Sequence, residues 1–354
     1  MRGFLAILCR LLAALLLVSV PAAADSDAQR IVAVGDLHGD YGAWLEIAQE
    51  SGVSTDGKHW TGGRSMLVQL GDIVDRGPDS LKIIRHLQAL EKEAAKAGGK
   101  VVVLLGNHEA MNVIGDLRYV DPGEYAVFVT HNSERTRKMV WQAMARSLVE
   151  QARATDPEVT PEAVRAAWMA RTPLGLIEHR SAWSPGGELG AWTSDRPALF
   201  KVGDILFAHG GISSEASAET IAAINARYAA ALAEGAEVDR SVLDDQLGPI
   251  WYRGNVIGAP DQGERPAPPG ELSAALAGMG VSRLVVGHTP SLAGIAVERD
   301  GQLIRIDTGI SKAYGGPASF LEIAGDETWA HERGLDGQWS RRALPDTPKT
   351  GKQP

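Results

Sequence analysis

The chain has 354 residues, of which 44% are hydrophobic and 22% are charged, and its formal net charge at pH 7 is −9. This composition is typical of an ordinary globular protein that is long enough to bury a substantial core. The acidic balance argues against a protein that binds the backbone of nucleic acids. The net charge does not exclude a small phosphorylated substrate, because cationic groups near a site can outweigh the weak electrostatic field of the whole protein.

Residues 1–24 have the pattern of an export signal. Arg2 and Arg10 lie around the start of an apolar run, and three alanines ending at Ala24 provide small residues for a cleavage site. A membrane anchor is the alternative, but the run Leu11–Val20 is shorter than the ~20 residues that a spanning helix needs. Cys9, the single cysteine, lies within this segment. We therefore expect a periplasmic or secreted protein that has no disulfide and no stable membrane anchor after cleavage.

The first predicted strand covers residues 31–34, "IVAV". A run of apolar residues without polar alternation suits a strand that is covered on both faces of its sheet. The strand leads into "GDLHG", so Asp36 and His38 lie just past its carboxyl end. Their side chains point the same way if the backbone stays extended, and the pair can then hold one metal ion. A helix is predicted to follow over residues 41–52.

Four further apolar runs end in a similar way. The run "MLVQL", residues 66–70, leads into "GDIVDRGPDS", and a helix is predicted from Pro78 to about Gly98. The other three runs lead into "GNHEA", "HGG" and "GHTP", and they cover residues 101–105, 205–208 and 283–286. Each run ends in glycine next to a side chain that can bind a metal. Because ligands bind beyond the carboxyl ends of strands in α/β sheets, we expect these loops to converge.

Residues 111–191 do not repeat this pattern of a short apolar run followed by glycine and a side chain that can bind a metal. They are predicted to form a mostly helical insertion. Apolar residues recur at helical spacing over residues 133–154, and Thr160 with Pro161 provides a cap and a first-turn residue. Because the insertion starts directly after "GNHE", we expect it to form a helical cap over the metal site. Its bulky apolar groups are expected to favour a flat phenyl ring over a short serine stem: Trp141, Met144, Trp168 and Met169.

The end of the chain differs in composition from the rest. From Asp326 onward it is polar and finishes "LPDTPKTGKQP", which predicts a disordered tail over residues 326–354. No internal repeat is evident. Residues 25–325 are therefore expected to form one domain that contains the insertion.

Six side chains at the strand ends make a donor set of nitrogen and oxygen without sulfur, which suits manganese, zinc or iron: Asp36, His38, Asp72, Asn107, His209 and His288. Six donors are too many for one catalytic ion that keeps an open position. Two ions ~3.5–4 Å apart that share one carboxylate would use them naturally, and Asp72 is the best candidate for that carboxylate. A lone Asp after a strand is more often a turn former or a cap. Five motifs at five strand ends are hard to explain as five independent caps.

The motifs "GDLHG", "GDIVDRG", "GNHE", "HGG" and "GHT" resemble the signature blocks of the calcineurin-like metallophosphoesterases. "VDRG" with "GNHE" narrows the resemblance to the phosphoprotein phosphatase branch, over about residues 31–323. The block "GPIWYRGN", residues 248–255, resembles bacterial Shewanella-like protein phosphatases. The resemblance implies an α/β fold, a β-sandwich flanked by helices, with residues 25–325 as its catalytic domain.

The resemblance also implies roles for individual side chains. Two divalent metal ions, manganese first and zinc or iron as alternatives, would share Asp72, with Asp36 and His38 on one ion and Asn107, His209 and His288 on the other. His108 would be the general acid, oriented by Asp75. Arg76 and Arg253 would bind phosphoryl oxygens, for which paired guanidinium donors are well suited. Glu109 has no clear role beyond support for its neighbours.

The expected function is therefore hydrolysis of a phosphoprotein or phosphopeptide by attack of a metal-bridging hydroxide, with a preference for phosphotyrosine. Diadenosine tetraphosphate and small phosphomonoesters are alternative substrates. A catalytically idle phosphate- or metal-binding module is the alternative of another class, but such a module has no need for His108 and Asp75. The tyrosine-bearing motif of the eukaryotic Ser/Thr enzymes is absent, and "RIDTGISKAYGG" stands in its place. The oligomeric state stays open.

Overall fold

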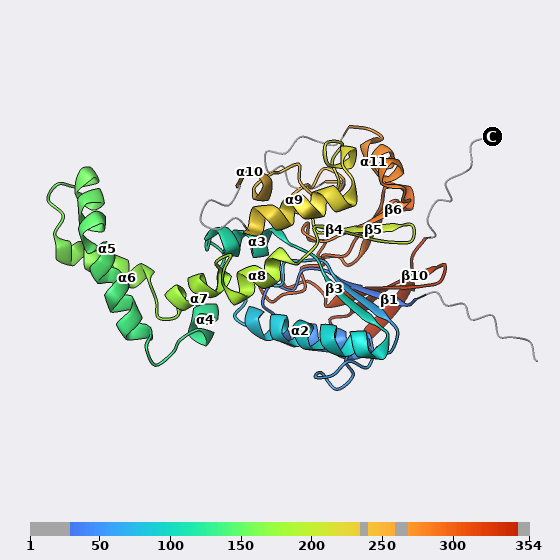
Figure 1. Cartoon of the computed structure of the whole chain (residues 1–354). Coiled ribbons are helices and arrows are strands. Elements are labelled where there is room, and N and C mark those ends of the chain that lie inside the picture. The colour runs from blue at the N-terminus through green and yellow to red at the C-terminus, as the bar shows by residue number, and fades with distance from the viewer. Residues whose placement is uncertain (1–28, 234–239, 259–267, 346–354) are drawn as a thin grey trace, which may run out of the picture.

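The computed structural model describes residues 29–233, 240–258 and 268–345 (Figure 1). The predicted export signal, residues 1–24, lies outside these ranges. Among the residues described, no helix is both long and apolar enough to cross a membrane.

Two sheets form the centre of the molecule. The six-stranded sheet has the order β11-β10-β9-β1-β2-β3, where β1 is Ile31–Val34, β2 is Met66–Gln69, β3 is Lys100–Val103, β9 is Ser319–Ala324, β10 is Glu327–Arg333 and β11 is Trp339–Ala343. The five-stranded sheet has the order β4-β5-β6-β8-β7, where β4 is Leu199–Val202, β5 is Ile205–Ala208, β6 is Arg283–Val286, β7 is Ala296–Glu298 and β8 is Leu303–Arg305. All five strands predicted from the apolar runs are present. β1, β2 and β3 are parallel, as are β5, β6 and β8.

The two sheets pack face to face, and helices cover their outer faces. Ala33 and Val68 of one sheet share an apolar core with Phe207, Val285 and Ile304 of the other. On the outer faces lie α1 (Tyr41–Glu50) and α2 (Ser80–Ala97) on one side, and α9 (Ile221–Ala233) and α11 (Glu271–Met279) on the other (Figure 1). β1 is therefore buried on both faces, which explains its apolar run. The predicted helix-flanked β-sandwich is confirmed.

The insertion is mostly helical, as predicted. It follows α3 (Asn107–Ile114) and contains α4 (Pro122–Val127), α5 (Ser133–Thr155), α6 (Pro161–Arg171), α7 (Leu176–Trp183) and α8 (Glu188–Ser194). The Thr160 hydroxyl caps α6 by accepting a hydrogen bond from the Ala163 amide, 3.2 Å away. A short α10 (Arg240–Leu243) lies further along the chain.

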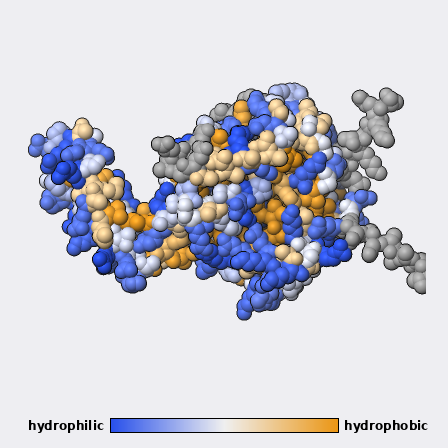
Figure 2. All heavy atoms as spheres, in the orientation of Figure 1, coloured by the Kyte–Doolittle hydropathy of each residue, from blue (hydrophilic) through white to orange (hydrophobic). Residues whose placement is uncertain are grey.

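Helices α5 and α6, with the turn between them, form an arm, residues 133–171, that projects from the body (Figure 1). The expectation that these helices cover the metal site is therefore wrong. Trp141 of α5 packs on Trp168 of α6, with ring centroids 5.6 Å apart, so these aromatic groups stabilise the hairpin and do not face the site. Hydrophilic residues dominate the far end of the arm (Figure 2).

The prediction of a disordered tail from Asp326 is wrong for residues 327–343. These residues form β10, which pairs antiparallel with β9, and β11, which pairs antiparallel with β10, so both continue the larger sheet. Outer antiparallel strands expose one face to water, so their composition is polar although they are ordered. Phe320 holds them to the body by stacking on His331, with ring centroids 4.2 Å apart, and by contacting Trp339. Residues 346–354 lie outside the described ranges.

A candidate metal centre with a phosphate site

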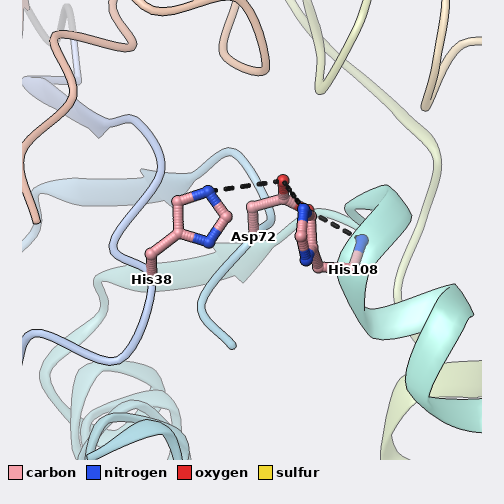
Figure 3. A group of neighbouring side chains, drawn as sticks. All are labelled: His38, Asp72 and His108. Carbon is pink, nitrogen blue, oxygen red and sulfur yellow. Dashed lines mark hydrogen bonds and ion pairs between the residues drawn. The ribbon is translucent and has the colours of Figure 1, made fainter. Parts of the chain in front are cut away.

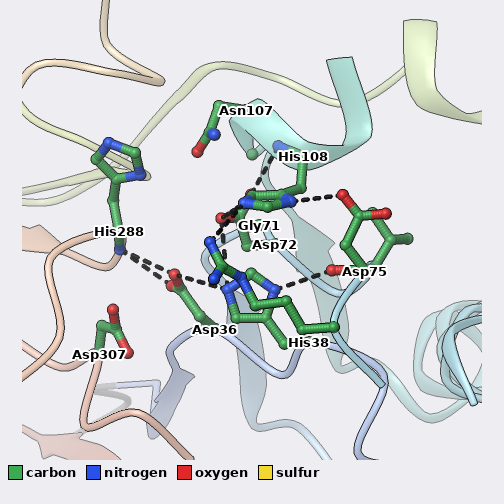
Figure 4. Close-up of polar contacts among 12 residues, drawn as sticks. Asp36, His38, Gly71, Asp72, Asp75, Asn107, His108, His288 and Asp307 are labelled. Carbon is green, nitrogen blue, oxygen red and sulfur yellow. Dashed lines mark hydrogen bonds and ion pairs between the residues drawn. The ribbon is translucent and has the colours of Figure 1, made fainter. Parts of the chain in front are cut away.

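The loops that follow β1, β2, β3, β5 and β6 meet at one edge of the sandwich (Figure 4). All ten side chains singled out in the sequence are joined there by direct contacts. On one side, Asp36 contacts His38, His38 contacts Asp72, and Asp72 contacts His108, which meets Asp75 and Arg76. On the other side, Asp72 contacts His209, which meets Asn107, and Asp36 contacts His288, which meets Arg253. The parallel order of the strands explains this convergence, since their carboxyl ends point the same way.

Asp72 lies at the centre of the cluster. Its Oδ2 atom is 3.2 Å from His209 Nε2 and 3.8 Å from His38 Nε2. Two groups of possible metal donors share this carboxylate: His38, Asp72 and His108 (Figure 3), and Asp72, His209 and His288. Within each group the donor atoms lie within 4.8 Å of one another. A carboxylate shared by two donor groups is the arrangement that a pair of metal ions requires.

Backbone carbonyls orient two of the histidines. The Nδ1 atom of His38 is 2.9 Å from the Val74 carbonyl, and the Nδ1 atom of His209 is 2.9 Å from the Leu70 carbonyl. Because a carbonyl only accepts, each Nδ1 carries a hydrogen and each Nε2 faces Asp72. Carbonyl partners of this kind fix the ring orientation of metal-binding histidines.

The buried charges of the cluster favour a cation. Burial lowers the pKa of His209, but Asp72 and Asp36 outweigh burial and raise it to about 9. Burial and the nearby Asp307 raise the pKa of Asp36 well above its usual range. The Nε2 atom of His288 is buried and has no hydrogen-bond partner among the residues described. Nitrogen and oxygen donors, buried carboxylates and an unpartnered imidazole together fit a two-ion site.

Asp307 is a site residue that sequence reasoning missed. It follows β8 at the same edge as the other loops, is buried, and lies beside Asp36 (Figure 4). Burial raises its pKa to about 6. Its signal is "LIRIDTG", a short run interrupted by Arg305 in which an acid and then a glycine follow the last apolar residue.

His108 and Asp75 form a close pair next to this cluster. His108 Nδ1 lies 2.5 Å from Asp75 Oδ2, and the other oxygen of Asp75 accepts a hydrogen bond from Asn112 Nδ2 at 2.9 Å. Burial lowers the pKa of His108, but the charges of Asp72 and Asp75 outweigh burial and raise the pKa above its ordinary value. The pair is thus arranged to hold a proton on the imidazole, with Nε2 toward Asp72 and Arg76.

Arg76 lies between two tyrosine rings that sequence reasoning did not identify. Its guanidinium carbon is 4.7 Å from the centroid of Tyr119 and 4.9 Å from that of Tyr314. Tyr119 also contacts His108, and Tyr314 contacts His38. Tyr314 belongs to "SKAYGG", part of the segment that stands in place of the eukaryotic tyrosine-bearing motif. Tyr119 comes from the insertion, and nothing in the sequence marks it.

Arg253 lies on the other side of the cluster, beside His288. Its Nη1 atom donates to the His288 carbonyl at 2.5 Å and to Thr289 Oγ1 at 2.9 Å. The block "WYRG" therefore brings a second guanidinium to the same edge of the sandwich. Two guanidinium groups on opposite sides of a cluster suit the several oxygens of one phosphoryl group.

Two buried glutamates hold the loop that follows β2. Glu109 accepts hydrogen bonds from the amides of Asp72 and Ile73, at 2.9 and 2.8 Å, and burial raises its pKa to about 7. Glu124 of α4 accepts from the Asp75 amide at 3.0 Å and from the Ser80 hydroxyl. Burial raises the pKa of Glu124 to about 8. Glu109 thus supports the loop of Asp72, and Glu124 joins the insertion to the loop of Asp75.

Five residues of the site have a backbone in the left-handed region, with positive φ angles: His38 at 42°, Asp72 at 52°, Asp75 at 69°, Arg76 at 66° and His288 at 64°. Residues other than glycine rarely adopt this backbone conformation, because their Cβ atom crowds the following carbonyl oxygen. The contacts from Glu109 and Glu124, and a 2.8 Å hydrogen bond from the Arg76 amide to the Tyr119 carbonyl, keep two of these turns in place.

Known proteins resemble this chain in sequence and in structure. The model of the family described as calcineurin-like phosphoesterase matches residues 29–292. An uncharacterised protein of Schizosaccharomyces pombe is 32% identical over 307 residues, which cover 84% of this chain and 78% of that protein. Shewanella-like protein phosphatase 2 of Arabidopsis thaliana is 30% identical and covers 84% of this chain, which spans 76% of that protein. The structure of a cold-active protein tyrosine phosphatase is similar with a TM-score of 0.64 at 26% identity, over 90% of this chain and 79% of that one.

Proposed function

Because this chain belongs to the calcineurin-like phosphoesterase family, we propose that it is a metal-dependent phosphatase of phosphorylated proteins or peptides that prefers phosphotyrosine. The observation that carries this proposal is the His108–Asp75 pair, 2.5 Å apart, next to a buried cluster of metal donors and to Arg76. A module that only binds phosphate or metal has no use for such a pair.

Arg76 and Arg253 bind different oxygens of the phosphoryl group. Arg76 Nη2 lies 3.3 Å from His108 Nε2, so a phosphoryl group in contact with this guanidinium also meets the imidazole. Arg253 binds a second phosphoryl oxygen from the side of His288. Both guanidinium groups stay charged and offer paired planar donors, which fix the orientation of the phosphoryl group as well as its position.

His108 gives the proton that the leaving oxygen needs. Asp75 accepts the hydrogen on Nδ1, which turns Nε2 toward the phosphate and stabilises the charged imidazolium. Asn112 and Glu124 hold Asp75 in turn, through its side chain and its amide.

Asp36, His38, Asp72, Asn107, His209 and His288 would hold two divalent cations, with Asp72 between them. We propose manganese for this site, since nitrogen and oxygen donors without sulfur suit it, and zinc or iron would also fit. Such a pair supplies Lewis-acid stabilisation of phosphoryl oxygens and activates water for attack on phosphorus.

The preference for phosphotyrosine is supported by the rings beside Arg76. Tyr119 is 41% exposed, so its ring is accessible next to the guanidinium that binds phosphate. A phenyl ring that follows the phosphate outward would meet Tyr119 and Tyr314, whereas the stems of phosphoserine and phosphothreonine are too short to reach both. The resemblance to a solved tyrosine phosphatase agrees with this preference.

Tyr119→Ala should lower the ratio of phosphotyrosine to phosphothreonine turnover by about 3- to 10-fold, since an aromatic pair is worth ~0.5–1.5 kcal/mol. Tyr119→Phe keeps the ring and should keep the ratio. kcat/KM on two peptides that differ only in the phosphorylated residue measures the effect. An unchanged ratio in the alanine variant would mean that Tyr119 does not select between the two substrates.

Replacing the arm, residues 133–171, with a short Gly/Ser linker should leave that ratio unchanged, because the arm projects away from the body. The ends of the arm are adjacent, since Ser133 Oγ donates to Glu178 at 2.7 Å and Arg137 donates to the Thr172 carbonyl at 3.2 Å, so a short linker can join them. If a folded, metal-replete variant showed a different ratio of phosphotyrosine to phosphothreonine turnover, the arm would be a part of the enzyme that selects the substrate.

One panel tests the proposed function as a whole. The protein is loaded separately with Mn²⁺, Zn²⁺ or Fe²⁺ and assayed on peptides that carry phosphotyrosine, phosphoserine or phosphothreonine, on p-nitrophenyl phosphate and on diadenosine tetraphosphate. We expect the highest kcat/KM on phosphotyrosine peptides with Mn²⁺. Faster turnover of diadenosine tetraphosphate than of every peptide would assign the enzyme to nucleotides instead.

We also propose that the protein is exported. The support is the signal pattern of residues 1–24, which ends in small residues at Ala24. Protein isolated from a periplasmic extract for the same panel should begin at Asp25. An intact N-terminus in the cytoplasmic fraction would contradict export.

A further inference from the structure

A groove of about 500 Å³ lies between the first turns of α1 and α2 and the end of α4. Its walls are apolar and come from Tyr41, Leu81 and Val127, and its rim carries Lys58, Lys82 and Arg85. Val127 is 47% exposed, and Tyr41 and Leu81 are half-buried. α4 belongs to the insertion and lies beside the start of α2 (Figure 1), so the insertion completes the groove.

The groove lies close to the catalytic edge. Leu81 follows Arg76 by five residues, so their Cα atoms are at most ~17 Å apart, because an extended chain spans ~3.3–3.6 Å per residue. Tyr41 follows His38 by three residues. Between them Gly39 packs directly on Gly77: a Cβ atom added to Gly39 would lie 2.3 Å from the Gly77 carbonyl oxygen. The loop after His38 and the loop after Arg76 separate the site from the groove, and they pass each other at two glycines.

The charges at the rim are complementary to an acidic partner. Lys58 is exposed, and the other two cations form exposed pairs, Lys82 with Asp79 at 2.6 Å and Arg85 with Glu188. Lys82 and Arg85 would have to release these acids before they could bind a ligand's carboxylate, and the pair of Arg85 with Glu188 is bidentate. Lys58 is therefore the rim cation that an acidic side chain of a partner meets most readily.

We propose that this groove binds the substrate polypeptide about three to five residues away from the phosphorylated residue, taking one bulky apolar side chain next to an acidic one. The proposal rests on the proposed function, since it extends a phosphopeptide from Arg76 into the groove. An extended peptide advances ~3.3 Å per residue, so five residues cover the ~17 Å that is the largest possible separation of the Arg76 and Leu81 Cα atoms. The apolar walls take the apolar side chain, and Lys58 at the rim takes the acid.

Phosphotyrosine peptides that carry Leu-Asp at positions three to six on either side of the phosphate test this proposal against matched Ala-Ala peptides. We expect about a 10-fold higher kcat/KM for Leu-Asp on one side of the phosphate, the order that one buried apolar side chain supplies. The preference should weaken at high salt. Equal kcat/KM for every matched pair would overturn the proposal, and this comparison needs no variant enzyme.

Variants assign the preference to the groove. Val127→Asp places an acid in the wall, and Lys58→Glu reverses a rim charge, so both should remove the preference for Leu-Asp while p-nitrophenyl phosphate turnover stays unchanged. Val129→Asp is the matched control, because Val129 is 44% exposed in the same segment but does not line the groove. Equal effects of Val127→Asp and Val129→Asp would overturn the assignment. Turnover of p-nitrophenyl phosphate without turnover of any peptide would contradict the proposed function itself.

Discussion

Asp72→Asn should nearly abolish turnover of every phosphomonoester, by about 10³-fold or more, and should lower the metal content below two ions per chain. The carboxylate of Asp72 lies 3.2 Å from His209 Nε2 and 3.8 Å from His38 Nε2, at the point shared by both donor groups. A neutral amide offers one oxygen and no charge to two cations. The loss of several kcal/mol of Lewis-acid stabilisation corresponds to a rate loss of this size. Turnover on p-nitrophenyl phosphate and elemental analysis of the purified protein measure both effects.

The asparagine variant should still fold. The Asn side-chain oxygen can replace Asp72 Oδ1, which accepts the His108 amide at 3.0 Å, and asparagine tolerates the left-handed backbone of Asp72. Asp300→Asn is a matched control, because Asp300 has nearly the same φ angle, 53° against 52°, and lies outside the cluster. A folded Asp72→Asn protein that keeps two metal ions and near-normal turnover would contradict the shared-carboxylate role.

His108→Asn should lower kcat on phosphopeptides by ~10²–10⁴-fold, the usual contribution of a general acid. The loss should be much smaller on dinitrophenyl phosphate, whose leaving oxygen needs no proton. The dependence of kcat on the leaving-group pKa, measured over a series of aryl phosphates, should become steeper in the variant. Asp75→Asn should show the same change in slope, since Asp75 holds the Nδ1 hydrogen of His108.

The same experiment separates two roles of His108. This histidine also belongs to one of the two groups of possible metal donors, with His38 and Asp72. Equal losses on good and poor leaving groups, together with a lower metal content, would identify His108 as a metal ligand. A steeper leaving-group dependence at full metal content would identify it as the acid.

The positions of the candidate metal donors could be predicted because they depend on local sequence. A buried strand, a glycine and a polar side chain lie within a few residues of one another, and parallel strands bring such ends together without further information. Asp307 follows the same rule after β8, but a single acid after a short strand looks like a turn former. Its role became visible only from its burial beside Asp36.

The rest depends on tertiary packing that local patterns do not encode. Helical spacing predicts that α5 and α6 form, but it says nothing about where they point, and Trp141 and Trp168 pack on each other. Tyr119 and Glu124 lie beside the site because the root of the insertion packs against the turn of Asp75 and Arg76. The strands β10 and β11 look polar because they are outer strands. They pair with each other and with the neighbouring β9, and β9 joins them to β1, which lies far away in the sequence.

The left-handed backbone at five site residues has a thermodynamic consequence. At roughly 1–2 kcal/mol each for His38, Arg76 and His288, and less for the two aspartates, these conformations cost about 3–6 kcal/mol, a large share of the net stability of a typical domain. The packing of the sheets and helices must supply that free energy in every molecule, whether or not substrate is present. Glycine at any of the five positions would relieve part of the cost and remove a side chain to which the proposed mechanism gives a role. A version of this protein engineered for heat resistance alone would therefore lose its activity first at these turns.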